Sequence, residues 1–99
     1  MAAQENNTQE ISEILEERGS NYGDFSGVAT IAQALKEIIH NDVDFIYTNW
    51  NSLSPVQKES LEMIASKMGR ILNGDPNYAD SWIDIAGYAK LVADELQGE

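Results

Sequence analysis

The sequence contains no cysteine, only two prolines and no long apolar run. Without cysteine there can be neither a disulfide framework nor a zinc site held by thiolates, so the cytoplasm is the expected compartment. A membrane helix needs roughly 20 apolar residues, which no segment approaches, and the polar start MAAQENNTQE is unlike a signal peptide. We therefore expect a soluble cytoplasmic protein without a membrane partner.

Basic residues are also scarce, because six lysines and arginines stand against 17 aspartates and glutamates and give a formal net charge of -11. A charge of this sign repels nucleic-acid phosphates at long range. Direct nucleic-acid binding is therefore not expected. The partners that remain are a small molecule chelated to a metal ion and a basic protein surface.

A length of 99 residues predicts one small domain. Residues 1–7 are expected to form a disordered lead-in, and residues 8–97 a single all-helical domain. Apolar residues recur at helical spacing in four segments, which predicts an all-α fold. The expected helices cover residues 8–18, 26–40, 55–73 and 79–96.

Local signals set the ends of these helices. Ser54 followed by Pro55 and Gln57 is a capping-box start for the third helix. Gly19 is the expected stop of the first helix, and Gly74 is expected to end the third in a left-handed conformation. The turn that follows predicts an antiparallel hairpin of helices three and four. Between residues 41 and 54 we expect a helical turn and an ordered loop.

The fourth predicted helix is apolar on more than one side. Trp82, Ile85 and Val92 lie on one stripe, whereas Ile83 and Leu91 point elsewhere. A helix that is apolar nearly all round is buried on several sides. In a domain this small we expect a homo-oligomer that completes the core. We expect Gly87 where another helix or a ligand comes close to the backbone of this helix.

Two pairs of acidic residues are candidates for a magnesium site. Glu59 and Glu62 are three residues apart in the third helix, and Asp80 and Asp84 are one turn apart in the fourth. Mg²⁺ prefers carboxylate oxygens that converge from different elements. The alternatives are a solvated acidic face for the glutamates and helix capping for Asp80.

Cationic and aromatic residues add candidates for nucleotide contacts. Lys67 and Arg70 lie within one turn and are expected to bind phosphate oxygens, the alternative being helix salt bridges such as Glu62 with Lys67. Tyr78 and Trp82 are candidates for stacking on a base, although such residues more often belong to the core, which we favour for Trp82.

The segments ERGSNYGDF, IAQALK, SPVQKESLEMIASKMGRILNGDPNY and DSWIDIAGYAKLVADEL resemble a family of short phage and prophage proteins of unknown function. More distantly, the second half is similar to MazG-type all-alpha nucleoside triphosphate pyrophosphohydrolases. The resemblance implies a dimeric or tetrameric four-helix arrangement in which Glu-x-x-Glu and Glu-x-x-Asp motifs hold Mg²⁺.

Residue by residue, Glu59 and Glu62 match the first motif and Asp84 matches the last acid of the second. Two positions depart from the pattern: Ser81 stands three residues before Asp84, where an acid is expected, and Lys58 precedes the first motif instead of a further glutamate. Asp80 supplies the earlier acid at a spacing of four.

The resulting hypothesis is a nucleotide-binding protein that hydrolyses a (deoxy)nucleoside triphosphate with Mg²⁺. Glu62 and Asp84 are its expected catalytic residues, and they also bind the metal together with Glu59 and Asp80. The alternative is a phage-encoded anti-defence protein in the host cytoplasm, which sequesters a nucleotide signal or binds a basic host protein through its acidic surface. An interaction module without a small ligand is the third possibility.

Overall fold

The computed structural model describes the backbone of residues 2–98 and the side chains of residues 8–98. This part of the chain is helical and contains no strand, so the predicted all-α class is confirmed. The elements are α1 (Ala2–Tyr22), α2 (Phe25–Ile39), the short 3₁₀ helix η1 (Trp50–Ser52), α3 (Pro55–Asn73) and α4 (Ala79–Leu96).

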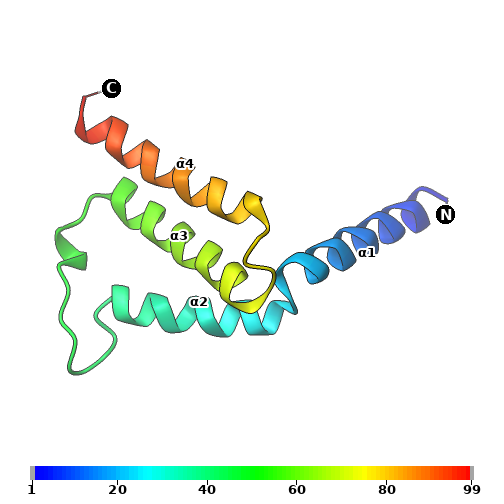
Figure 1. Cartoon of the computed structure of the whole chain (residues 1–99), viewed down its shortest axis with the longest axis horizontal. Helices are drawn as coiled ribbons and strands as arrows, with labels where there is room; N and C mark the ends of the chain where they lie inside the picture. Colours follow the sequence, from blue (N-terminus) through cyan, green and yellow to red (C-terminus); the bar gives the residue numbers. More distant parts are fainter. Residues whose placement is uncertain (1, 99) are drawn as a thin grey trace.

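Helix α3 is the centre of the fold. It packs against α2 on one side and α4 on the other, and α4 runs back along α3 after a short connection (Figure 1). Helix α1 projects away from these three helices and touches α2 and α3 only near its C-terminal end (Figure 1). The ends of α1 and α3 and the starts of α2 and α4 therefore meet at one corner of the molecule.

The start of α3 has the predicted capping box. Ser54 Oγ accepts a hydrogen bond from the Gln57 N–H at 3.1 Å, and Gln57 Oε1 accepts one from the Ser54 N–H at 2.9 Å. Pro55 occupies the first turn, where its missing N–H needs no partner. These local interactions explain why the predicted N-terminus of the helix is correct.

Helix α1 is longer than the predicted span 8–18. It starts at Ala2, within the segment assigned to a lead-in, whose first residue Met1 lies outside the described residues. Gly19 was expected to end the helix, but it lies inside α1. The chain turns instead at Gly23, whose φ of 77° is a conformation that glycine adopts without strain. Asp24 then caps α2 by accepting from the Gly27 N–H at 2.7 Å.

The end of α3 is held by side-chain and backbone hydrogen bonds rather than by a left-handed glycine. Gly74 has φ -135°, so the predicted left-handed conformation is wrong. The Asn73 amide donates to the carbonyl oxygens of Tyr22 and Asp24 at 2.9 and 3.0 Å, and the Asp75 N–H donates to Asn21 O at 2.7 Å. Gly74 lies so close to the Tyr22 backbone that a Cβ would overlap it.

The loop between α2 and α3 agrees with the expected helical turn and ordered segment. Asn41 has a φ of 66°, and its side-chain amide donates to Thr48 O at 3.2 Å while its oxygen accepts from the Thr48 N–H. The Thr48 hydroxyl donates to Ile39 O at 3.0 Å. The loop is therefore closed onto the C-terminal end of α2.

The described residues form only a small core. Its buried apolar members are Val28, Ala32 and Ala65, and no large side chain is fully buried. Trp82 is 54% exposed, so the prediction that it belongs to the core is wrong for a single chain. Apart from Gly87's own stretch of helix, no atom of the described residues comes within 4 Å of a Cβ placed on Gly87, which contradicts a close approach there within one chain. Other large apolar side chains of α3 and α4 are also exposed: Leu61, Met68, Leu72, Ile83, Leu91 and Leu96.

Candidate functional site

A pair of oppositely charged residues joins α3 to α4. Lys67 Nζ lies 3.1 Å from Asp84 Oδ2, and the lysine side chain is only 11% exposed whereas the aspartate side chain is 47% exposed. The alternative considered for Lys67, a salt bridge with Glu62 on its own helix, is not formed, because Lys67 pairs with Asp84 and Glu62 lies beside His40. Asp84 has no basic neighbour along its own helix, and its partner comes from α3. The contact brings a predicted phosphate-binding residue and a predicted metal ligand together.

A second set of contacts connects the same two helices through aromatic rings. The Arg70 guanidinium carbon lies 4.7 Å from the centroid of the Tyr22 ring, a cation–π contact. Tyr22 meets Tyr78 edge to face with centroids 5.8 Å apart. The Tyr78 hydroxyl donates to Asp80 Oδ2 at 2.8 Å, and this hydrogen bond is the main reason why the pKa of Tyr78 rises from 10.0 to about 12.

The two sets of contacts start and end at neighbouring positions on the same two helices. Lys67 and Arg70 are three residues apart on α3, and Asp80 and Asp84 are four apart on α4, so each pair shares a helix face. Five predicted site residues thus lie in one group, which we call the polar ring and which also includes Tyr22. Its members are Tyr22, Lys67, Arg70, Tyr78, Asp80 and Asp84.

The other two predicted metal ligands lie outside the polar ring. Glu62 Oε1 is 2.7 Å from His40 Nε2, although the two groups are not oriented as a hydrogen bond. The His40 ring packs on Trp50 with centroids 4.5 Å apart, and Lys58 Nζ lies 5.5 Å from the same indole. Glu59 is exposed. Glu62 is therefore part of a separate cluster where α2 ends.

Among the described side chains, those of residues 8–98, no three histidines, aspartates or glutamates gather as a metal site would require. The four predicted ligands form two pairs instead, one on α3 and one on α4. Three of them already have partners: Glu62 has His40, Asp80 has Tyr78, and Asp84 has Lys67. A magnesium ion held by all four needs these pairs to rearrange or a second chain to contribute.

The predicted base-stacking residues are placed differently from each other. Tyr78 is half-buried within the polar ring. The Trp82 indole N–H donates to Pro76 O at 2.8 Å, which fixes a half-exposed ring at the start of α4. Of the two, Trp82 has the more accessible aromatic face.

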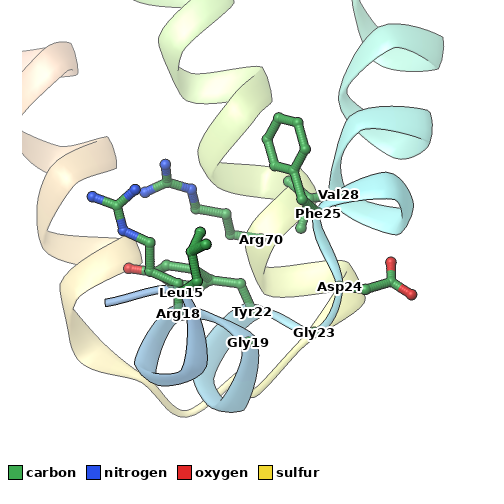
Figure 2. A pocket seen from close by; sticks show the side chains of 9 residues that line it. All are labelled: Leu15, Arg18, Gly19, Tyr22, Gly23, Asp24, Phe25, Val28 and Arg70. Atoms are coloured by element: carbon green, nitrogen blue, oxygen red, sulfur yellow. The ribbon is translucent and has the colours of Figure 1, made fainter. Parts of the chain in front are cut away.

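A cavity of about 300 Å³ opens beside the polar ring, where α1, α2 and α3 meet (Figure 2). Arg18 from α1 and Arg70 from α3 line it, and their side chains lie on the same side of it in Figure 2. Sequence reasoning gave Arg18 no site role, although it belongs to the quoted segment ERGSNYGDF. The full lining is Leu15, Arg18, Gly19, Tyr22, Gly23, Asp24, Phe25, Val28 and Arg70.

A family model described as a domain of unknown function, DUF6378, matches residues 7–96. No curated protein and no solved structure matches the chain. Within the part of the chain that the structure describes, no helix is both long and apolar enough to cross a membrane.

Proposed function

The chain belongs to the DUF6378 family, and we propose that this member binds a nucleotide together with Mg²⁺ at the polar ring. We further propose that it hydrolyses a (deoxy)nucleoside triphosphate to the monophosphate and pyrophosphate in the cytoplasm. The observation that carries the proposal is the contact between Lys67 and Asp84, because it places a phosphate-binding candidate beside a metal-binding candidate. The MazG-type resemblance supplies the reaction.

Each residue has a defined role in this proposal. Asp80 and Asp84 would hold Mg²⁺ from α4, and Glu59 and Glu62, which lie outside the polar ring, would join them from α3 once the present pairs rearrange or a second chain contributes. Mg²⁺, when bound, neutralises charge on the phosphate oxygens. Lys67 and Arg70 bind the phosphate oxygens. Besides their role at the metal, the carboxylates of Glu62 and Asp84 orient the attacking water. Tyr78 and Trp82 provide aromatic surface for the base.

We also propose that the α3–α4 hairpin is completed by a second copy of the chain. The chain exposes 7089 Å², whereas a compact monomer of its mass exposes about 5,600 Å². Part of the excess of about 1,500 Å² belongs to α1, which projects from the other helices (Figure 1), and an obligate homodimer buries an area of this order on each partner. Homodimerisation thus accounts for the small core and for the exposed apolar residues of α4.

The proposed interface is an apolar groove of about 340 Å³ between α3 and α4. Five of its seven lining residues are apolar and none is charged. In a chain with a net charge of -11, two copies repel each other least where they meet through such an uncharged apolar surface. Packing two such hairpins together gives a four-helix bundle. The groove is lined by Leu53, Gln57, Ser60, Leu61, Ile64, Ala89 and Val92.

Turnover tests the enzymatic part of the proposal. The eight common nucleoside and deoxynucleoside triphosphates are incubated with the protein and Mg²⁺, and phosphate is detected with malachite green after added pyrophosphatase. We expect Mg²⁺-dependent release from at least one of them, with losses in Glu62→Gln and Asp84→Asn. Absence of turnover, or variants that match the wild type, rejects the hydrolase.

A second candidate function is binding without hydrolysis. Two contacts favour it: Asp84 is paired with Lys67, and Glu62 lies beside His40. Paired carboxylates are less available to a metal ion. A phage-encoded protein of this kind sequesters a nucleotide signal and so counters host defence. It then shows a thermal shift with a nucleotide that it does not consume.

The acidic surface offers a non-enzymatic alternative without a small ligand. With a net charge of -11, the chain is suited to occupy a basic host protein. Such a protein shows no thermal shift with nucleotides, and it retains a basic partner in a pull-down that weakens as salt increases.

A further inference from the structure

We propose that the cavity between α1, α2 and α3 is a phosphate site in which Arg18 and Arg70 together bind a di- or triphosphate group. These two residues are the only arginines in the sequence, and they come from segments 52 positions apart. Guanidinium groups bind phosphate oxygens in a bidentate manner, and two of them on the same side of one cavity can bind neighbouring phosphates of one ligand. The site adds Arg18, which lies outside the polar ring.

The charge balance of the cavity favours an anion. The chain carries 17 acidic residues, yet neither arginine forms an ion pair with any described residue. Two cations facing one cavity repel each other unless an anion lies between them. The one carboxylate in the lining, Asp24, directs Oδ1 to the Gly27 N–H at 2.7 Å and the Ser26 hydroxyl at 3.1 Å. Its charge is thereby used to cap α2.

Arg70 is held in place for this role. Its guanidinium stacks over the Tyr22 ring, which restricts the side chain before any ligand binds. Tyr22 in turn packs on Tyr78 of the polar ring. The cavity and the polar ring therefore share Arg70 and Tyr22, so a ligand that fills one touches residues of the other.

The remaining walls indicate what the phosphate is attached to. Leu15, Phe25 and Val28 are apolar, and Phe25 is 82% exposed at the rim (Figure 2). A volume of about 300 Å³ is at the lower end of small-molecule sites. A phosphate ester with a planar or apolar body fits such a lining. That the body is a nucleoside rests on the proposed function, whereas the phosphate contact does not.

The test is calorimetric titration of the full chain with inorganic pyrophosphate, tripolyphosphate and deoxyadenosine triphosphate. We expect Arg18→Gln and Arg70→Gln each to weaken binding of the inorganic probes about tenfold, and the double variant to abolish it. Lys36→Gln is the matched control, because it removes one positive charge from α2 outside the cavity lining. It should change binding less than twofold. Equal effects in all three single variants, or no binding by the wild type, overturn the proposal.

Arg70→Gln also removes the contact with Tyr22 and so tests stability as well as binding. A second measurement uses the wild-type protein alone: phenylglyoxal modifies exposed arginines, and pyrophosphate should slow modification of both Arg18 and Arg70, as read by mass spectrometry. No protection at either residue overturns the proposal.

Failure of this site and failure of the proposed function give different results. Binding of inorganic pyrophosphate through the arginines without nucleotide binding or turnover supports the phosphate site and rejects the nucleotide function. Nucleotide binding that depends on Lys67, Arg70 and Asp84 but is unchanged in Arg18→Gln rejects the phosphate site between the two arginines and supports the proposed function.

Discussion

The ammonium group of Lys67 is buried between α3 and α4, and the carboxylate of Asp84 lies 3.1 Å from it at the protein surface. A buried cation is stable only when a counter-ion or several acceptors compensate for its lost hydration. Asp84 therefore stabilises the helix pair besides its proposed role at a metal ion. This double role makes it the most informative position for mutation.

Replacing Asp84 by asparagine should lower the free energy of unfolding by about 1–2 kcal/mol, because Lys67 remains buried without its counter-ion. Urea denaturation without added metal measures the change. Asp94→Asn is the control, since it breaks the exposed pair of Asp94 with Lys90 and should cost no more than about 0.5 kcal/mol. An Asp84→Asn protein as stable as the wild type would show that the pair does not stabilise the fold.

A separate measurement, the thermal shift caused by Mg²⁺, tests whether Asp84 binds the metal ion. If Asp84 binds Mg²⁺, the thermal shift produced by Mg²⁺ with a bound nucleotide should be present in the wild type and absent in Asp84→Asn. The same shift in both proteins would remove Asp84 from the proposed metal site while leaving its contact with Lys67 intact.

Tyr78 should give the protein a pH dependence in the alkaline range. Its pKa is raised from 10.0 to about 12, chiefly because its hydroxyl donates to Asp80. A folded-state pKa above the unfolded one stabilises the fold fully below pH 10, and this contribution is lost as the pH rises towards 12. Absorbance at 295 nm should show one late-titrating tyrosine in the wild type. The late component should disappear in Tyr78→Phe and move to lower pH in Asp80→Asn, and its persistence in Tyr78→Phe would contradict the assignment.

Gly23→Ala should destabilise the protein by about 2 kcal/mol or more, because a side chain is strained at its φ of 77° and a Cβ would meet the Asn73 backbone. Gly87→Ala is the opposite case. Outside its own stretch of helix, no described atom lies within 4 Å of the added Cβ, so Gly87→Ala should raise helix stability by about 0.5–1 kcal/mol. Thermal melts of both variants test the difference, and equal effects would show that the α1–α2 turn is not tight.

Leu61→Asp should convert the proposed homodimer to a monomer, because it places a charge in the apolar groove between α3 and α4. Light scattering at micromolar concentration measures the mass. Ile11→Asp is the control: Ile11 is also exposed, at 58%, but it lies on α1 outside the groove. A wild-type protein that is strictly monomeric, or a dimer that Leu61→Asp leaves intact, rejects the interface.

The sequence alone determined the helical class and the bounds of most helices. The predicted spans 55–73 and 79–96 are those of α3 and α4, and the predicted span 26–40 differs from α2 by one residue at each end. These features depend on capping residues and on apolar spacing within one helix, which are local properties of the chain. Local signals predicted Gly19 as the end of α1, whereas the turn lies at Gly23, beside the Asn73 side chain at the end of α3.

The tertiary structure alone decided which site residues meet. Lys67 and Asp84 are 17 positions apart, and Arg18 and Arg70 are 52 apart, so no spacing rule connects either pair. The candidates from the sequence included Lys67, Arg70, Tyr78, Asp80 and Asp84, but not Arg18. Packing also left Trp82 half-exposed, because one chain has too few helices to cover both faces of α4. Helix formation is governed by neighbours along the chain, whereas a site is governed by which helix faces pack together.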